Sequence, residues 1–367
     1  MLIGIDASRA AVAQRTGTEN YSLNLIRHLV ALDQKNSYRL YLNRPPPREL
    51  RIANCELRVM PFPRLWTHVR LSREMMRRPP DVLFVPAHVL PIVHPRASVV
   101  TVHDLGYLYF PHAHRPLDRL YLDLSTRHNA CAAAHLISDS QATKRDLVER
   151  YGVDPAKIAV VYPGYDAAAF RPVRDEAAIE AVRARYGIAG EYILSVGTLQ
   201  PRKNLVRLIE AFAICDLQSA ICNLQLVITG KRGWLYEEIF TKVYQLGLED
   251  EVIFTGYVAG SDLPALLSGA SLFVMPSLYE GFGLPVLEAM ACGVPVVCSN
   301  VSSLPEVAGE AAILVDPLDV GGMAAAMEQV LSDEELRAKL SARGFERARR
   351  FLWENCARET LAVLESV

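Results

Sequence analysis

The sequence predicts an α/β protein made of two doubly wound domains, each built on a parallel β-sheet. Its 367 residues exceed what one hydrophobic core usually covers, so two domains of about 150–200 residues are expected. Hydrophobic residues make up 51% of the chain, which is enough for large cores and excludes disorder. Short apolar runs alternate with helical patterns along the chain, as is typical of parallel sheets whose strands are connected by helices.

The apolar runs that fit buried strands form two series. The first series occupies residues 2–6, 38–42, 57–60, 81–86, 98–105, 135–138 and 158–162. The second occupies residues 192–196, 224–229, 252–257, 271–275, 295–298 and 312–315. Helical patterns between them cover residues 20–32, 141–150, 204–215, 287–291, 320–331 and 334–350, with Ser140 as a predicted N-cap.

The two series are separated by a segment rich in proline and aromatic residues, 163–172, which predicts an interdomain connection. We therefore predict one domain over residues 1–165 and a second over residues 166–350. Ligands of doubly wound sheets bind beyond the carboxyl ends of the strands. The residues that follow each predicted strand are therefore the candidates for a site.

Charge is distributed unevenly between the two halves. Residues 1–169 contain 22 Lys and Arg against 15 Asp and Glu, a net of +7, and the remainder contains 17 against 26, a net of −9. Such asymmetry indicates that one domain meets an anionic partner. The overall charge of −2, without a platform of basic and aromatic residues, argues against nucleic-acid binding.

The sequence predicts a cytoplasmic protein. No apolar run approaches the roughly 18 residues that a transmembrane helix needs. The first six residues form a strand pattern without the basic start of a signal peptide. The seven cysteines are scattered in neither a metal-ligand spacing nor a disulfide framework, which fits a reducing compartment.

The stretch from Leu278 to Ala289 is the most informative part of the chain. It follows a buried strand pattern and contains a glycine-rich turn, Gly281-Phe282-Gly283-Leu284, followed by Pro285, which suits the first position of a helix. Backbone N–H groups at such a helix start can hold a phosphate or a polar sugar. Two carboxylates, Glu280 and Glu288, flank the turn, and a loop that only connects two elements would not need them.

Two pairs of cations follow strands of the second series. Arg202 and Lys203 lie between a strand pattern and Asn204, a predicted helix N-cap, and suit a diphosphate because Arg offers a fork and Lys a point charge. A solvated basic turn is the alternative. Lys231 and Arg232 occupy the equivalent place after the next strand, where a surface turn is an equally good interpretation.

Two candidates lie in the first series. Gly17 and Thr18, before the first helix, could approach a phosphate, although an ordinary turn glycine is the more common case. His103 and Asp104 end the fifth strand pattern, where they could bind a substrate, with the acid fixing the tautomer of the ring. A capping or core histidine is the alternative.

The stretch from Arg64 to Arg78 is the most basic part of the chain. Arginines at 64, 70, 73, 77 and 78 are interleaved with apolar side chains. The stretch could touch anionic lipid or an acidic acceptor. The alternative is a helix of the first domain whose apolar side belongs to the core.

Taken together, these residues resemble the retaining glycosyltransferases of family four, which have the GT-B fold, two Rossmann-like domains facing across a cleft. The strongest part of the match is Glu280-Gly281-Phe282-Gly283-Leu284-Pro285 with Glu288, preceded by Gly197-Thr198-Leu199-Gln200-Pro201-Arg202-Lys203-Asn204. Segment 351–367, which begins Phe351-Leu352-Trp353, is similar to the family's terminal helix that crosses back to the first domain. Many relatives have an arginine in place of Thr198, so Arg202 is expected to supply more of the positive charge.

The resemblance implies a role for each matching residue. Lys203 and Arg202 would bind the donor's diphosphate, and Glu288 would hold the ribose hydroxyls. Glu280, with the backbone of residues 281–284, would hold the transferred sugar or the adjoining phosphate. His103, with Asp104, would lie near that sugar, and Gly17 with Thr18 near the diphosphate. Tyr257 and Val258 fall where relatives place the base.

The resemblance also implies a function. The second domain would bind a nucleotide-diphosphate sugar, with GDP-mannose as the first choice, and the first domain would bind a glycan or lipid-linked acceptor. Anomeric configuration would be retained without a metal or other cofactor. Independently of the resemblance, the composition of Arg64–Arg78 could place the protein peripherally at the inner face of a membrane. The alternatives are a hydrolysing sugar-nucleotide epimerase of the same fold and a catalytically silent nucleotide-sugar-binding protein.

Overall fold

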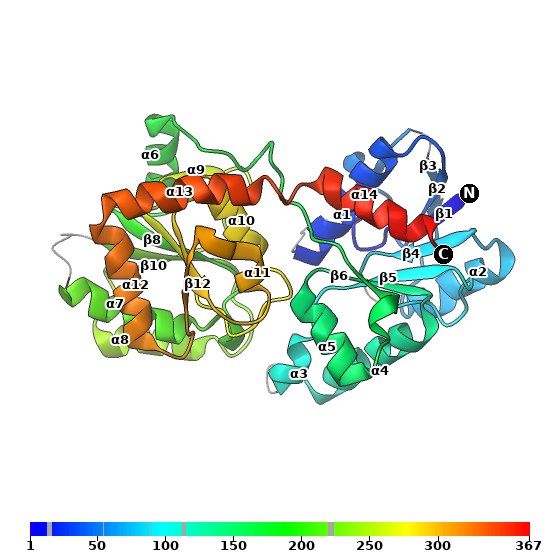
Figure 1. Ribbon diagram of the computed structural model, residues 1–367, viewed down its shortest axis with the longest axis horizontal. Coiled ribbons are helices and arrows are strands. Elements are labelled where there is room, and N and C mark those ends of the chain that lie inside the picture. Colours follow the sequence, from blue (N-terminus) through cyan, green and yellow to red (C-terminus); the bar gives the residue numbers. More distant parts are fainter. Residues whose placement is uncertain (13–16, 54, 88, 112–114, 219–223) are drawn as a thin grey trace. The chain divides into compact units, whose positions relative to one another are not determined.

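The computed structural model describes residues 1–12, 17–53, 55–87, 89–111, 115–218 and 224–367 (Figure 1). These residues divide into two compact units. Unit 1 contains Met1–Gly164 together with Trp353–Val367, and unit 2 contains Tyr165–Leu352. The chain passes between the units after residues 164 and 352, where the sequence analysis expected residues 165 and 350, and the end of the chain belongs to unit 1.

Unit 1 is built on a seven-stranded sheet in which every described strand pairing is parallel. The strand order is β3-β2-β1-β4-β5-β6-β7. The strands are β1 (Leu2–Asp6), β2 (Ser37–Leu42), β3 (Cys55–Val59), β4 (Val82–Val85), β5 (Ser98–Val102), β6 (His135–Ser138) and β7 (Ile158–Val160). All residues of β4 and β5 are buried, as expected for central strands covered on both faces.

The helices of unit 1 include one contributed by the end of the chain. They are α1 (Gly17–Leu32), η1 (Arg48–Leu50), the π-helical turn η2 (Trp66–Leu71), α2 (Ser72–Arg77), α3 (Gly106–Tyr109), α4 (Pro116–Ala132), α5 (Gln141–Tyr151), η4 (Pro155–Lys157) and α14 (Trp353–Glu365). Helix α14 packs against α1, and its buried Trp353, Ala357 and Leu364 enter the core of unit 1. The predicted cap is confirmed, since Ser140 accepts a hydrogen bond from the Thr143 N–H at 3.0 Å.

Unit 2 is built on a six-stranded sheet, again with parallel pairing throughout the described strands. Its strand order is β10-β9-β8-β11-β12-β13. The strands are β8 (Tyr192–Val196), β9 (Gln225–Thr229), β10 (Val252–Gly256), β11 (Leu272–Met275), β12 (Val296–Ser299) and β13 (Ile313–Val315). Both sheets are therefore doubly wound Rossmann-like sheets, as predicted.

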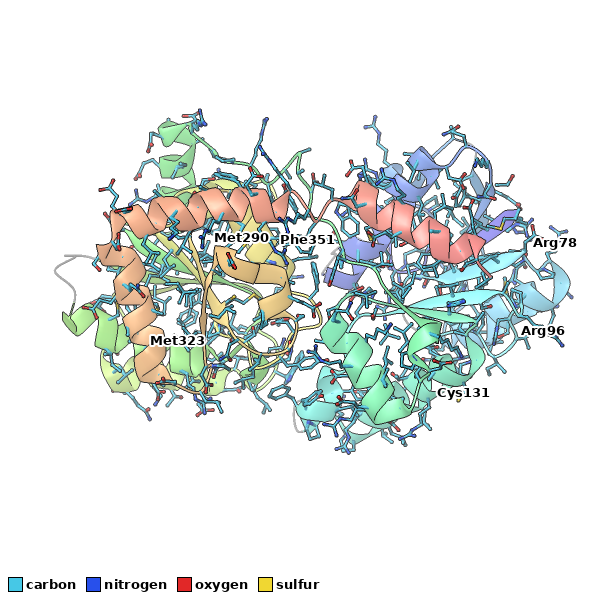
Figure 2. The ribbon with its side chains drawn as sticks, viewed as in Figure 1. Arg78, Arg96, Cys131, Met290, Met323 and Phe351 are labelled. Atoms are coloured by element: carbon cyan, nitrogen blue, oxygen red, sulfur yellow. The ribbon has the colours of Figure 1, made fainter. Side chains whose placement is uncertain are left out.

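The helices of unit 2 cover its sheet and carry its core. They are α6 (Glu176–Arg185), η5 (Pro201–Lys203), α7 (Leu205–Gln218), α8 (Glu237–Leu246), α9 (Leu263–Ser268), α10 (Leu284–Ala291), α11 (Leu304–Ala308), η6 (Gly309–Ala311), α12 (Val320–Ser332) and α13 (Glu334–Ala348). Met290 of α10 and Met323 of α12 are fully buried (Figure 2). Because Leu284 opens α10, Pro285 takes the second helical position instead of the first.

The strand orders decide where the candidate residues lie. In unit 2 the order reverses between β8 and β11, and the segments after these two strands carry Lys203 and Glu280. In unit 1 it reverses between β1 and β4, and His103 follows the next strand, β5. Each set therefore lies at a carboxyl end near a switch point, where doubly wound sheets bind ligands. Among the described residues, no helix combines the length and apolar character needed to cross a bilayer.

Candidate functional site

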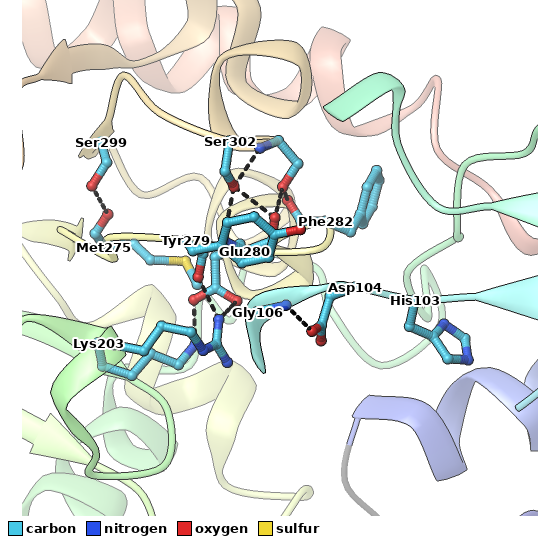
Figure 3. Close-up of polar contacts among 12 residues, drawn as sticks. His103, Asp104, Gly106, Lys203, Met275, Tyr279, Glu280, Phe282, Ser299 and Ser302 are labelled. Atoms are coloured by element: carbon cyan, nitrogen blue, oxygen red, sulfur yellow. Dashed lines mark hydrogen bonds and ion pairs between the residues drawn. The ribbon is translucent and has the colours of Figure 1, made fainter. Parts of the chain in front are cut away.

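Glu280 forms ion pairs with both predicted cations in unit 2 (Figure 3). Its Oε2 lies 2.9 Å from Nη1 of Arg202, and its Oε1 lies 2.7 Å from Nζ of Lys203. Burial alone would raise the pKa of Glu280, but the charges of Arg202 and Lys203 outweigh burial and lower it to about 2. The three side chains form a single charged cluster with one net positive charge, which we call the Glu280 cluster.

The backbone around the cations is held by contacts between β8, β11 and β13. The Leu278 N–H donates to the Arg202 carbonyl at 2.9 Å, and the Arg202 guanidinium donates to the Tyr279 carbonyl. The Asn204 amide donates to the carbonyls of Pro276 and Pro317, at 3.0 and 2.6 Å. Asn204 therefore ties the cation segment to the ends of two other strands.

Gly197, at the end of β8, makes room for Lys203. A Cβ atom at this position would lie 2.9 Å from Cε and 3.2 Å from Nζ of Lys203. A side chain at position 197 would therefore displace the end of the Lys203 side chain from its path to Glu280. Gly197 and Asn204, at the two ends of the predicted segment, thus both help to position Lys203.

Two serines that the sequence analysis missed hold the glycine-rich turn in place. The Glu280 N–H donates to Ser302 Oγ at 2.8 Å, and Ser303 Oγ donates to the Phe282 carbonyl at 2.7 Å (Figure 3). Both serines follow β12, so the rule of inspecting residues after each strand could have found them. Gly283 has φ of 112°, which favours glycine, and it directly precedes α10.

Glu288 lies in the second turn of α10, apart from the Glu280 cluster. Among the described residues, its carboxylate takes part in no ion pair. Burial and the charge of Asp166 raise the pKa of Glu288 to about 7. The two acids that flank the turn are thus held in opposite states, one firmly ionised and one close to neutral.

The two cations after β9, Lys231 and Arg232, contact different aromatic rings. Nζ of Lys231 lies 4.8 Å from the centre of the Tyr257 ring, which is exposed, whereas the neighbouring Val258 is buried. The Arg232 guanidinium instead stacks on the rings of Tyr236 and Phe240, at 5.5 and 4.9 Å. Lys231 therefore packs on the ring of Tyr257, and Arg232 packs on the rings of Tyr236 and Phe240.

His103 in unit 1 is bonded through both ring nitrogens. Its Nδ1 lies 2.6 Å from Oδ2 of Asp139, and its Nε2 lies 2.9 Å from the Pro86 carbonyl oxygen. The sequence analysis expected the adjacent Asp104 to fix the tautomer of this ring, and that expectation is wrong. Oδ1 of Asp104 instead accepts from the Gly106 N–H at 2.8 Å (Figure 3). The partner follows β6, whose register with β5 sets Ser138 beside Val102, and a sequence alone does not reveal such a pairing.

A cavity of about 330 Å³ in unit 1 is lined by His103. Its other lining residues are Arg9, Thr18, Glu19, Val89, Thr101, Val102, Asp104, Tyr107, Tyr121, Leu122, Ser125, Thr126 and Asn129. Hydroxyl, carboxyl and aromatic groups thus surround a space large enough for a sugar ring. Gly17 opens α1 beside Thr18, and a Cβ atom at Gly17 would meet nothing within 4 Å, so close packing does not require this glycine.

Comparisons with known proteins show the family to which the chain belongs. A family model described as "Glycosyltransferase Family 4" matches residues 15–169, and one described as "Glycosyl transferases group 1" matches residues 179–347. The chain is 37% identical to the O-antigen chain mannosyltransferase B of Escherichia coli over 266 residues, which cover 72% of this chain and 69% of that protein.

Two further relatives match over a smaller part of their own length. The mannosylfructose-phosphate synthase of Agrobacterium fabrum is 35% identical over 60% of this chain and 50% of that protein. The serotype-specific mannosyltransferase WbdA of Escherichia coli is 38% identical over 49% of this chain but only 22% of its own.

Solved structures share the fold over the full chain. A sucrose-phosphate synthase from Thermosynechococcus elongatus superposes with a TM-score of 0.77 at 22% identity, covering 100% of this chain and 98% of that one. HepE from Anabaena, in complex with UDP-glucose, also gives 0.77, at 19% identity with 100% and 99% covered. Together with the matching family models and the mannosyltransferase relative, this fold shows that the chain belongs to the family-four, group 1 glycosyltransferases of GT-B fold and is a glycosyltransferase.

Proposed function

We propose that this glycosyltransferase transfers mannose from GDP-mannose to a hydroxyl of a glycan or lipid-linked acceptor, with retention of anomeric configuration. The Glu280 cluster carries the proposal, because it places two cations and an acid at the switch point of unit 2. The names of two relatives, an O-antigen chain mannosyltransferase and WbdA, favour mannose among the possible sugars.

In the proposed reaction the diphosphate of the donor binds Lys203 and Arg202, whose charges stabilise the leaving group as the glycosidic bond breaks. The glycine-rich turn offers its backbone N–H groups to the same phosphate or to the sugar. Glu288 accepts hydrogen bonds from the ribose hydroxyls. No step requires a metal ion or a cofactor, since the fixed cations supply the positive charge.

We propose the cavity beside His103 as the acceptor site. Glu19, Asp104 and Ser125 on its wall can bond sugar hydroxyls, and the ring of Tyr121 offers an apolar face to a pyranose. This chemistry suits the hydroxyl-rich, uncharged end of a growing glycan.

The test is a screen of nucleotide sugars followed by a transfer assay. We expect GDP-mannose to raise the melting temperature more than UDP-glucose does, because a ligand stabilises the folded state in proportion to its affinity. Transfer to a mannose-terminated acceptor should then appear with GDP as the second product. Stabilisation by UDP-sugars alone would contradict the mannose assignment.

The same assay distinguishes the two alternatives. A hydrolysing epimerase would release free UDP from a UDP-sugar without any acceptor. A silent binding protein would be stabilised by the donor but would show no turnover with any acceptor. Acceptor-dependent release of the nucleotide contradicts both.

We also propose peripheral contact with an anionic membrane through the stretch Arg64–Arg78. Trp66, Leu71 and Met75 of this stretch are buried in the core of unit 1, as expected if its apolar side belongs to that core. Leu65, Val69 and Met76 are nevertheless exposed. The exposed arginines among them are Arg64, Arg73, Arg77 and Arg78, whereas Arg70 pairs with the buried Glu74 at 3.3 Å.

Helix α4 extends this surface. Its exposed Leu117, Leu120 and Leu124 are spaced as one helical stripe, and Nε2 of His68 in η2 lies 3.2 Å from the hydroxyl of Tyr121 on the same helix. An apolar stripe continuous with exposed arginines matches the chemistry of an anionic bilayer surface.

Vesicle sedimentation tests the membrane contact. We expect the protein to bind phosphatidylglycerol vesicles more than phosphatidylcholine vesicles, and the triple variant R64S/R73S/R77S to bind them less. A matched control, R171S/R174S/R350S, removes the same charge from exposed positions of unit 2. Equal loss of binding in both variants would show that vesicle binding depends only on the net charge of the protein. It would contradict a specific membrane-binding surface.

A further inference from the structure

We propose that Asp139 is a positioning residue for the reaction. It holds the His103 ring so that both nitrogens are engaged, and His103 serves as a fixed polar wall of the acceptor cavity instead of a proton acceptor. The inference rests on the proposed function only for its kinetic consequence, because the state of the ring follows from unit 1 alone.

The two contacts of the ring determine which of its nitrogens carry a proton. A backbone carbonyl can only accept, so Nε2 of His103 must carry a proton to bond the Pro86 oxygen at 2.9 Å. At 2.6 Å, Nδ1 and Oδ2 of Asp139 must share another proton. Wherever that proton lies, the pair is neutral as a whole and His103 keeps no lone pair for a substrate.

Burial raises the pKa of Asp139, although the charge of His103 and the bond to it act in the opposite direction. Burial would lower the pKa of His103, but the charges of Asp139 and Asp104 and the bonds to Asp139 and Pro86 raise it above its ordinary value. Helix α1 supplies the Tyr21 ring, edge-on to His103 with ring centres 4.6 Å apart. The titratable groups that face His103 are therefore the two carboxylates and one phenol.

Asp139 has the properties of a dedicated partner. It is buried, and its Oδ1 has no hydrogen-bond partner among the described residues, so the bond to His103 is the one polar contact that its carboxylate makes there. A buried carboxylate with a single partner is costly unless that partner is charged and fixed. Helix α14 closes the far side, since Trp353 lies edge-on to Tyr21 at 5.7 Å.

A chemical consequence follows for the transfer step. When the acceptor hydroxyl attacks the sugar, its proton must go to a group other than His103, because both ring nitrogens are already bonded. The leaving diphosphate, which gains negative charge as the glycosidic bond breaks, can take that proton. His103 contributes a fixed ring position, which the bond to Asp139 holds, and the pair adds no net charge.

Nitrogen-15 NMR of the full chain, selectively labelled in histidine, tests the ring state without any substrate. We expect His103 to show two protonated ring nitrogens from about pH 5 to 8, the range in which ordinary histidines titrate. The Asp139→Asn variant should lower the pKa of His103 into that range, whereas Asp104→Asn should leave both nitrogens protonated. A wild-type His103 that titrates with a free lone pair would overturn the proposal.

Kinetics then test the positioning role. In Asp139→Asn we expect kcat to fall by at least about tenfold, the size of effect of losing one hydrogen bond to a charged group. The loss should grow as pH rises through the new pKa of His103, and the KM for the donor should stay nearly unchanged. An equal loss at every pH, with His103 still doubly protonated, would assign Asp139 a merely structural role.

The two readouts fail separately. Absence of transfer in the wild-type protein would overturn the proposed function and leave the NMR result standing. If Asp139→Asn does not fold, the wild-type spectrum alone decides the state of the ring.

Discussion

Lys203 and Glu280 are joined by an ion pair of 2.7 Å, although 77 residues separate them in the chain. In this arrangement Glu280 occupies the cations that the donor's diphosphate would need. Under the proposed function, the diphosphate would take over Lys203 and Arg202 from Glu280, and Glu280 would become available to the sugar hydroxyls. Glu280 would then compete with the product diphosphate and favour its release.

Glu280→Gln should consequently bind GDP more tightly than the wild type while transferring sugar more slowly. The neutral amide keeps the shape of the side chain but no longer offsets the charges of Arg202 and Lys203. Titration calorimetry with GDP measures the affinity, and a transfer assay measures kcat. Weaker GDP binding in this variant would contradict the competition.

Lys203→Ala should abolish transfer while the protein stays folded. It removes a cation from the diphosphate and leaves Glu280 paired with Arg202 alone. Because Arg202 still neutralises Glu280, only a modest fall in the melting temperature is expected. Circular dichroism checks the fold, and unchanged turnover would remove Lys203 from the diphosphate site.

The stability of unit 2 should decline in acid because of Glu280. Its pKa is about 2 in the folded protein and about 4.5 in the unfolded chain, so the ion pairs stabilise the fold fully above pH 4.5. The difference corresponds to about 3 kcal/mol, which is lost as pH falls from 4.5 towards 2. Urea unfolding at several pH values measures it. Glu280→Gln should show a smaller dependence on pH over this interval.

Binding of GDP-mannose should strengthen as pH rises through about 7. Ionised Glu288 can accept from two ribose hydroxyls, whereas the neutral carboxyl gives up acceptor capacity, and its pKa of about 7 places the change near neutrality. The nucleotide sugar is the suitable ligand because its diphosphate does not titrate there. Calorimetry from pH 6 to 8 should show the trend in the wild type. A pH-independent affinity in Glu288→Gln is the matching control.

Gly197→Ala should reduce transfer with little loss of fold. The added Cβ would lie 2.9 Å from Cε of Lys203 and force that side chain off its path to Glu280. Gly260→Ala is the matched control, because a Cβ atom at this glycine of unit 2 meets nothing within 4 Å. Equal activity in the two variants would show that Lys203 adapts to the methyl group.

The features that sequence patterns predicted are those with local causes. Every predicted strand is present within a few residues of its expected ends, because buried parallel strands are continuous apolar runs. The glycine-rich turn and the cations after β8 were predicted from their place at strand ends. Their mutual ion pairing was not, because it depends on the adjacency of β8 and β11, which only the strand order shows.

The partners of the site depend on such long-range pairings. Asp139 reaches His103 through the register of β5 and β6, and Ser302 reaches Glu280 from the loop after β12. An acid adjacent in sequence, Asp104, was the natural candidate for the His103 partner, but its carboxylate turns back to the Gly106 N–H. Side-chain direction at the end of a strand is thus set by the neighbouring loop rather than by proximity in the chain.

The return of α14 to unit 1 has a consequence for biosynthesis. Trp353 and Leu364 fill the core formed by residues 1–164, so this core remains incomplete until the ribosome has passed position 364. Unit 2 is contiguous over residues 165–352 and can fold earlier as an insertion between the two parts. A chain that ended before α14 would therefore leave uncovered the apolar side chains of α1 against which α14 packs.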